Sequence, residues 1–265
     1  HQPLTAKEVK LAFKDADGNP MEKALTIPGL HEAGRGNEKP QVIPEIAEWY
    51  SDSNGKFRMN ESSKIVLGSE ELRDIGEEFR KDLEDITGKK LSVVLGTADS
   101  ARAGDLFFTL GSGDTMLGEE GYAMEIGGAA VTEGIHTAGV YWATRSILQM
   151  IKLSEDGISM PQGQIRDYPK YAVRSFVFDV ARKAVSMDML KDVAKNMAWY
   201  KMNDLQVHLN DNLIFLEDYY DEDDPDPTDA FAAYSGYRLE SDVAKDGTSI
   251  ASADYHYTKE EFGSF

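Results

Sequence analysis

RSFVFDVARKAVSMDMLKDVAKNMAWYKMNDLQVHLNDN, residues 174–212, is the stretch of the chain that decides the fold. Residues 174–179 and 205–209 are short runs rich in β-branched, aromatic and other apolar side chains, which is typical of strands. Ser186 can cap a helix between them, and its apolar face follows steps of three and four residues through Leu190, Val193, Ala194 and Met197. This order of strand, helix and strand predicts a βαβ unit with parallel strands and a right-handed crossover.

Charged and polar residues gather where the two predicted strands end. Asp179 and Arg182 follow the first strand, and His208, Asp211 and Asn212 lie at or just beyond the end of the second. In parallel α/β sheets and barrels, ligands bind at the carboxyl ends of the strands. The sequence therefore predicts a site at this edge. Within it we interpret Asp179 and Arg182 as an ion pair that fixes the strand end rather than as a catalytic pair.

Length and charge limit the classes of protein that this chain can belong to. Its 265 residues have room for about two domains, and 41% hydrophobic residues can build real cores. The formal net charge of -19 disfavours nucleic acid and anionic membrane surfaces as partners. No apolar run approaches the roughly 18 residues of a spanning helix, so we expect no membrane insertion.

The inventory of reactive residues points away from metal and cofactor chemistry. With no cysteine, the chain has no disulfide, thiol nucleophile or thiolate metal ligand. Its five histidines form no HExxH motif, and no Gly-rich phosphate loop is present, so we expect neither a metal nor a cofactor. Absence of cysteine fits a secreted bacterial protein and fits many cytosolic ones nearly as well. Since His1 opens the chain without initiator Met or signal peptide, we expect a processed or cut chain.

Local patterns predict a chain of the α/β class in four parts. Residues 1–41 are interpreted as an N-terminal strand and loop segment, and 42–152 as an α+β domain with an antiparallel sheet and two helices. Gly and Pro residues mark 153–169 as a linker, and the βαβ pattern opens 170–265. Residues 217–229 are acidic and broken by Pro, which indicates a solvated loop or one that overhangs the site.

Several stretches, in order along the chain, resemble family 20 glycoside hydrolases. EGYAMEI at 120–126 and GVYWATRSILQ at 139–149 are similar to the end of the α+β domain that precedes the family's catalytic barrel. RSFVFDVAR, WYKMNDLQVHLND and YHYTKEEF, which begin at residues 174, 199 and 255, resemble the opening of that barrel. The resemblance implies that residues 170–265 are the first β/α units of an incomplete TIM barrel.

Substrate and activity follow from the same resemblance. The family contains β-N-acetylhexosaminidases and lacto-N-biosidases, so the implied partners are glycans with terminal N-acetylhexosamine. The implied location is extracellular or on a bacterial cell surface. The leading expectation is the N-terminal part of a retaining β-N-acetylhexosaminidase. A lacto-N-biosidase, or a non-catalytic carbohydrate-binding or surface module, is the alternative.

The resemblance also assigns roles to individual residues. In relatives, an Arg near the start of the first barrel strand holds hydroxyls of the terminal sugar, and Arg174 matches it. A guanidinium can grip two sugar oxygens together, although Arg174 can instead form a salt bridge within the barrel. Asp211 matches the acidic residue after the second strand, with His208 and Asn212 alongside as substrate-binding candidates. The alternative for His208 is a satisfied core imidazole that faces into the barrel.

One departure from the family pattern concerns the catalytic residues. Family 20 enzymes use an adjacent Asp-Glu pair after the fourth barrel strand: the Glu protonates the leaving oxygen, and the Asp orients the substrate's own attacking acetamido group. We expect this pair to lie outside the chain, so that no catalytic residue is present and the fragment is inactive alone. Two strands cannot close an eight-stranded barrel, which predicts an exposed sheet edge and possible self-association through it.

Overall fold

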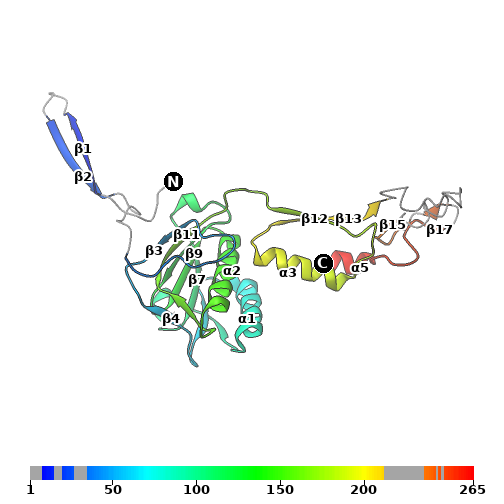
Figure 1. The fold of residues 1–265 in the computed structure, drawn as a ribbon, viewed down its shortest axis with the longest axis horizontal. Coiled ribbons are helices and arrows are strands. Elements are labelled where there is room, and N and C mark those ends of the chain that lie inside the picture. Colours follow the sequence, from blue (N-terminus) through cyan, green and yellow to red (C-terminus); the bar gives the residue numbers. More distant parts are fainter. Residues whose placement is uncertain (1–7, 15–19, 27–34, 212–235, 243, 246–247) are drawn as a thin grey trace. The chain divides into compact units, whose positions relative to one another are not determined.

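The computed structural model describes residues 8–14, 20–26, 35–211, 236–242, 244–245 and 248–265. The chain divides into two compact units, His1–Lys170 and Tyr171–Phe265 (Figure 1). Strands β1 (Glu8–Lys14) and β2 (Pro20–Thr26) form an antiparallel hairpin near the N-terminus. The acidic segment 217–229 and Asn212 lie outside the described residues.

A seven-stranded mixed sheet is the centre of the first unit, with strand order β3-β11-β8-β9-β7-β5-β6. Its strands are β3 (Glu48–Tyr50), β5 (Lys64–Leu67), β6 (Ser92–Leu95), β7 (Leu106–Leu110), β8 (Tyr122–Ile126), β9 (Ala130–Gly134) and β11 (Gly163–Asp167). The neighbours β6, β5, β7 and β9 pair in parallel, whereas β9, β8, β11 and β3 pair in antiparallel fashion. The prediction of an antiparallel sheet is therefore wrong for the half that contains β6, β5 and β7. The helix between β5 and β6 returns the chain to the starting edge, which makes that pair parallel.

Helices α1 (Arg73–Thr87) and α2 (Thr137–Leu153) pack on this sheet and against each other (Figure 1). Helix α1 ends at Gly88, whose φ of 70° is left-handed and suits glycine. Its buried face carries Phe79, which meets Phe108 of β7 edge to face with ring centroids 5.3 Å apart. The two predicted helices are confirmed, and buried side chains of both the helices and the strands form the core of the unit.

Residues 153–169 do not form a linker, which corrects the predicted domain boundaries. Strand β10 (Ser159–Pro161) pairs with β4 (Lys56–Arg58), and β11 lies between β3 and β8 in the sheet. Gly163 is needed for close packing, because a Cβ there would lie 2.3 Å from the Trp49 ring. The predicted start at residue 42 is also late, since the Asn37 side chain donates to Gly55 O and Gln162 O.

The second unit contains the predicted βαβ arrangement. Strands β12 (Ser175–Asp179) and β13 (Asp204–His208) pair in parallel, and helix α3 (Met187–Trp199) lies between them in sequence. Ser186 caps α3 by accepting the Met189 backbone N–H, as predicted. Among its described residues, Val180, Met187, Leu190 and Tyr257 form a buried hydrophobic cluster.

Short elements complete the described part of this unit. They are β14 (Asn210–Asp211), β15 (Gly236–Tyr237), β16 (Ala244–Lys245), β17 (Thr248–Ser249) and α5 (Lys259–Ser264). Thr258 and Glu261 form a capping box at the start of α5. Within the described ranges, β12 and β13 are the one parallel pair of strands in the unit, so the TIM barrel stays a prediction. No helix among the described residues is long and apolar enough to cross a membrane.

Candidate functional site

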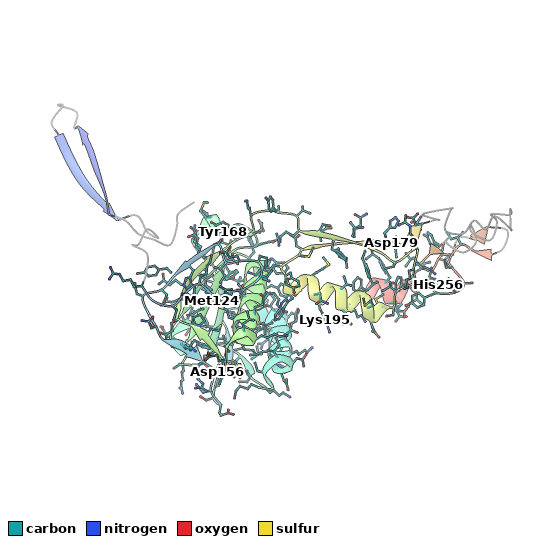
Figure 2. The ribbon with its side chains drawn as sticks, in the orientation of Figure 1. Met124, Asp156, Tyr168, Asp179, Lys195 and His256 are labelled. Atoms are coloured by element: carbon teal, nitrogen blue, oxygen red, sulfur yellow. The ribbon has the colours of Figure 1, made fainter. Side chains whose placement is uncertain are left out.

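The parallel pairing of β12 with β13 brings the predicted site residues together. Asp179, labelled in Figure 2, is directly opposite His208 in the register, and each is the last residue of its strand. Phe178 and Val207, the residues just before them, pack against the core cluster of the unit. Because successive side chains alternate between the faces of a strand, Asp179 and His208 project from the opposite face.

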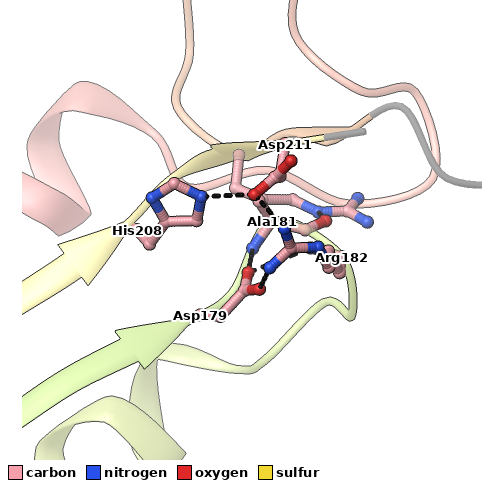
Figure 3. A network of polar contacts seen from close by, with 6 residues as sticks. Asp179, Ala181, Arg182, His208 and Asp211 are labelled. Carbon is pink, nitrogen blue, oxygen red and sulfur yellow. Dashed lines mark hydrogen bonds and ion pairs between the residues drawn. The ribbon is translucent and has the colours of Figure 1, made fainter. Parts of the chain in front are cut away.

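Arg182 joins two carboxylates at this edge (Figure 3). Its Nη1 lies 2.5 Å from Asp179 Oδ2, and its Nη2 lies 2.5 Å from Asp211 Oδ2. The same Asp211 oxygen lies 2.7 Å from His208 Nε2. The predicted Asp179–Arg182 ion pair is confirmed, and it extends to a cluster that spans the ends of both strands.

Backbone donors hold the Asp179 carboxylate in its charged form. Asp179 Oδ1 accepts the N–H of Ala181 at 2.9 Å and that of Arg182 at 3.2 Å. Burial acts to raise the pKa of Asp179, but these N–H donors and the Arg182 guanidinium outweigh it and hold the pKa below its ordinary value. Asp179 is therefore ionised at neutral pH, and it anchors one arm of the guanidinium.

Arg174 is at the other end of β12. It precedes the first residue of the strand, and five residues at about 3.3 Å each put it roughly 16 Å along the chain from Asp179. Its Nε donates to Lys201 O at 2.6 Å and its Nη1 to Tyr171 O at 2.8 Å. The structure does not bring Arg174 together with Asp211 and His208. These contacts hold its guanidinium at backbone carbonyls, and its predicted contact with the sugar stays a prediction.

The sequence predicts a structural ion pair of Arg182 with Asp179, and the structure adds Asp211 as a second carboxylate partner of the guanidinium. The signal for its place at this edge was available, because Arg182 follows the carboxyl end of a strand and Arg174 precedes the amino end. Ligand sites of parallel α/β folds form at the carboxyl end. Asn212 lies outside the described residues, so its predicted role is neither supported nor opposed.

Three of these side chains also have the composition of a metal site. Asp179, His208 and Asp211 offer ligand atoms that lie within 4.8 Å of one another, the one such group among the described residues. Arg182 already contacts both carboxylates and supplies the positive charge that they require. A cation would have to displace this guanidinium, so the arrangement fits recognition of a neutral polar ligand better.

Matches to known families account for both units. The model described as glycosyl hydrolase family 20, domain 2, matches residues 39–168, and the family 20 catalytic domain matches 171–216. The first model thus covers the mixed α/β unit, and the second covers the βαβ start with its polar strand ends. The chain belongs to glycosyl hydrolase family 20, which confirms the resemblance of its motifs.

Individual relatives agree with this assignment. The chain is 26% identical over 167 residues to a lacto-N-biosidase of Bifidobacterium bifidum, covering 62% of this chain and 14% of that protein. It is 37% identical over 92 residues to an N,N'-diacetylchitobiase of Vibrio harveyi, covering 34% and 10%. A solved family 20 β-N-acetylhexosaminidase of Streptomyces coelicolor A3(2) shares the fold, with a TM-score of 0.63 at 23% identity over 86% of this chain and 44% of that one. The matched region is well under two thirds of each relative.

Proposed function

We propose that the protein containing this chain removes terminal β-linked N-acetylhexosamine from glycans. The observation that carries the proposal is the polar cluster at the carboxyl ends of β12 and β13, inside the segment that matches the family 20 catalytic domain. Relatives named as hexosaminidases and a chitobiase support the same chemistry. A terminal sugar presents neighbouring hydroxyls, and each hydroxyl can both donate and accept a hydrogen bond.

In this proposal Arg174, which the resemblance matches to the sugar-holding arginine of the family's motif, holds hydroxyls of the terminal sugar. Its guanidinium is planar and offers a fixed fork of donors, so it can bind two neighbouring oxygens at once. Asp211 supplies a paired acceptor, and His208 orients it through Oδ2. Asn212, next in the sequence, remains a proposed substrate contact.

The proposed reaction is retaining hydrolysis assisted by the acetamido group of the substrate. That route needs a proton donor and an acidic residue to orient the acetamido group, and we assign both to residues outside 1–265. Residues 1–265 alone are then inactive. Since the substrates are glycans, the proposal includes an extracellular or cell-surface location in a bacterium.

Release of a disaccharide is a second candidate. The match to a lacto-N-biosidase extends over 167 residues, more than the 92 residues of the chitobiase match. A biosidase must accommodate two sugars, so it differs in the width of the pocket rather than in the groups that hold the terminal ring. A non-catalytic carbohydrate-binding or surface module is the remaining alternative.

Chromogenic substrates separate these functions. We expect the whole protein to release nitrophenol from N-acetyl-β-glucosaminide or from β-lacto-N-bioside, and the product that forms first to be the β-anomer by NMR. Hydrolysis of the bioside alone would favour the second candidate. Binding of N-acetylglucosamine without hydrolysis of either substrate would overturn the enzymatic proposal and favour the recognition module.

A further inference from the structure

Strand β6 forms one edge of the seven-stranded sheet in the first unit. It is last in the strand order and pairs with β5 alone among the described strands. Within the described part of the chain, residues 92–95 make no backbone hydrogen bond outside this pairing. The outer side of an edge strand presents N–H and C=O groups with which a further strand can pair. The sheet can therefore be extended at β6.

The opposite edge of the same sheet, at β3, is covered by the chain itself. Gly36 N–H donates to Ser51 O, directly after β3, at 2.8 Å. Trp49 Nε1, within β3, donates to Asn37 O at 2.9 Å. Among the described residues, no segment makes comparable contacts with β6. The two edges thus differ, and β6 is the one available to a partner.

The composition of β6 favours pairing. Its sequence, Ser-Val-Val-Leu, has β-branched and apolar residues that suit a strand. It contains neither a charged residue nor a proline, which natural edge strands use against association. Leu95, its last residue, is 54% exposed. A second strand at this edge would remove apolar surface of Leu95 from water, which stabilises the contact.

Charges on either side of β6 identify a second copy of the chain as the partner. Lys90 precedes the strand and Asp99 follows it, and both are exposed. Neither has an ion-pair partner among the described residues. In an antiparallel pair of identical strands, the basic end of each copy meets the acidic end of the other. A parallel partner in the same register would instead place Lys90 beside Lys90.

The spacing of these charges fits a two-fold axis at Val94. Lys90 lies four positions before Val94, and Asp99 lies five positions after it. The difference of one position corresponds to about 3.3 Å along a strand, which a lysine side chain can span. Each copy therefore contributes one lysine and one carboxylate to two equivalent ion pairs.

We propose that two copies of this chain associate through β6, by antiparallel pairing about a two-fold axis that joins their seven-stranded sheets into one. Such an interface is isologous, because both copies contribute the same residues. The formal charge of -19 on each copy opposes association at a distance, so the dimer depends on contacts at this edge. The inference does not rest on the proposed function, since association is measured without substrate.

Analytical ultracentrifugation of the whole protein over a range of micromolar concentrations tests this. We expect a monomer–dimer equilibrium, and we expect Leu95→Lys to raise the dimer Kd roughly tenfold or more. Leu153→Lys is the matched control, because Leu153 is 66% exposed at the end of α2 and should leave the Kd unchanged. A protein that stays monomeric over this range would overturn the inference, and so would a dimer whose Kd is unchanged in Leu95→Lys.

Reversal of the two charges tests the antiparallel register. Lys90→Asp alone, or Asp99→Lys alone, places like charges together at both ends and should weaken the dimer several-fold. The double variant should recover the original Kd, because each ion pair forms again with its charges exchanged. Both residues are exposed, so all three variants should fold. A double variant that dimerises as weakly as the single variants would refute the antiparallel pairing.

Discussion

Asp211 Oδ2 is the atom at which the candidate site converges, because it contacts both the guanidinium of Arg182 and the imidazole of His208. Two donors on one oxygen fix the carboxylate plane more firmly than either does alone. Asp179 completes the arrangement from the other strand by holding the second arm of Arg182. The geometry of the site therefore depends on the contacts that Arg182 and Asp211 make.

The free energy of unfolding should depend on whether Asp179 is charged. Its folded-state pKa lies below the ordinary value of 3.8, so its contribution is present above that pH and is lost as pH falls through the lower folded pKa. We expect Asp179→Asn to be less stable than the unmodified protein at pH 7, and the difference to shrink below about pH 4. Denaturant unfolding at several pH values measures it. A difference that stays constant down to pH 2 would show that the charge of Asp179 contributes nothing.

Among the elements, those with local signals could be predicted from sequence, and those that depend on distant pairing could not. The capped helix at Ser186 and the strands around it follow from residues within a short window. The place of β11 between β3 and β8 depends on residues more than 35 positions away. Pro161 and Gly163 indicated a linker because the same residues serve at edge strands and close contacts.

The same distinction explains what sequence could say about the site. Asp179, His208 and Asp211 could be found because strand ends are readable and their register follows from the βαβ rule. The contact between Arg182 and Asp211 depends on the path of the loop after β12, which no periodic pattern encodes.

Gly139 offers a test of how α2 meets the sheet. A Cβ at this helical position would lie 2.1 Å from Gly121 O, which is backbone and has little freedom to move. Alanine normally favours a helix by about 1 kcal/mol over glycine, but overpacking here should cost about 1–3 kcal/mol and prevail. We expect Gly139→Ala to lower the free energy of unfolding, as calorimetry would record. Gly113 is the matched control and should tolerate alanine, because a Cβ there would have no atom within 4 Å.

For the whole molecule, the two units differ in how much core they have. The first has a seven-stranded sheet covered by α1 and α2, whereas the described residues of the second have a smaller buried core beside α3. On β12, Phe176 is 41% exposed and Val177 57% exposed. A two-stranded sheet with exposed apolar residues is marginal alone, and further strands or another copy would cover it.

Hydrogen exchange of residues 1–265 should reveal this difference. We expect the amides of β12 and β13 to exchange faster than those of β7 and β9, because few buried contacts oppose local opening. Size-exclusion chromatography of the same sample shows whether copies associate through the open sheet. Strong protection of β12 and β13 in a monomeric preparation would contradict this expectation and mean that the second unit is stable by itself.

The proposed function of the whole protein requires an arginine that holds the terminal sugar. The most direct measurement is kcat/KM of Arg182→Met and Arg174→Met in the whole protein on a chromogenic N-acetyl-β-glucosaminide. We predict that Arg174→Met loses about 2–4 kcal/mol of transition-state binding. A near-normal kcat/KM with a lower Tm for Arg174→Met, with the loss in Arg182→Met instead, would contradict this assignment and leave Arg174 a structural residue.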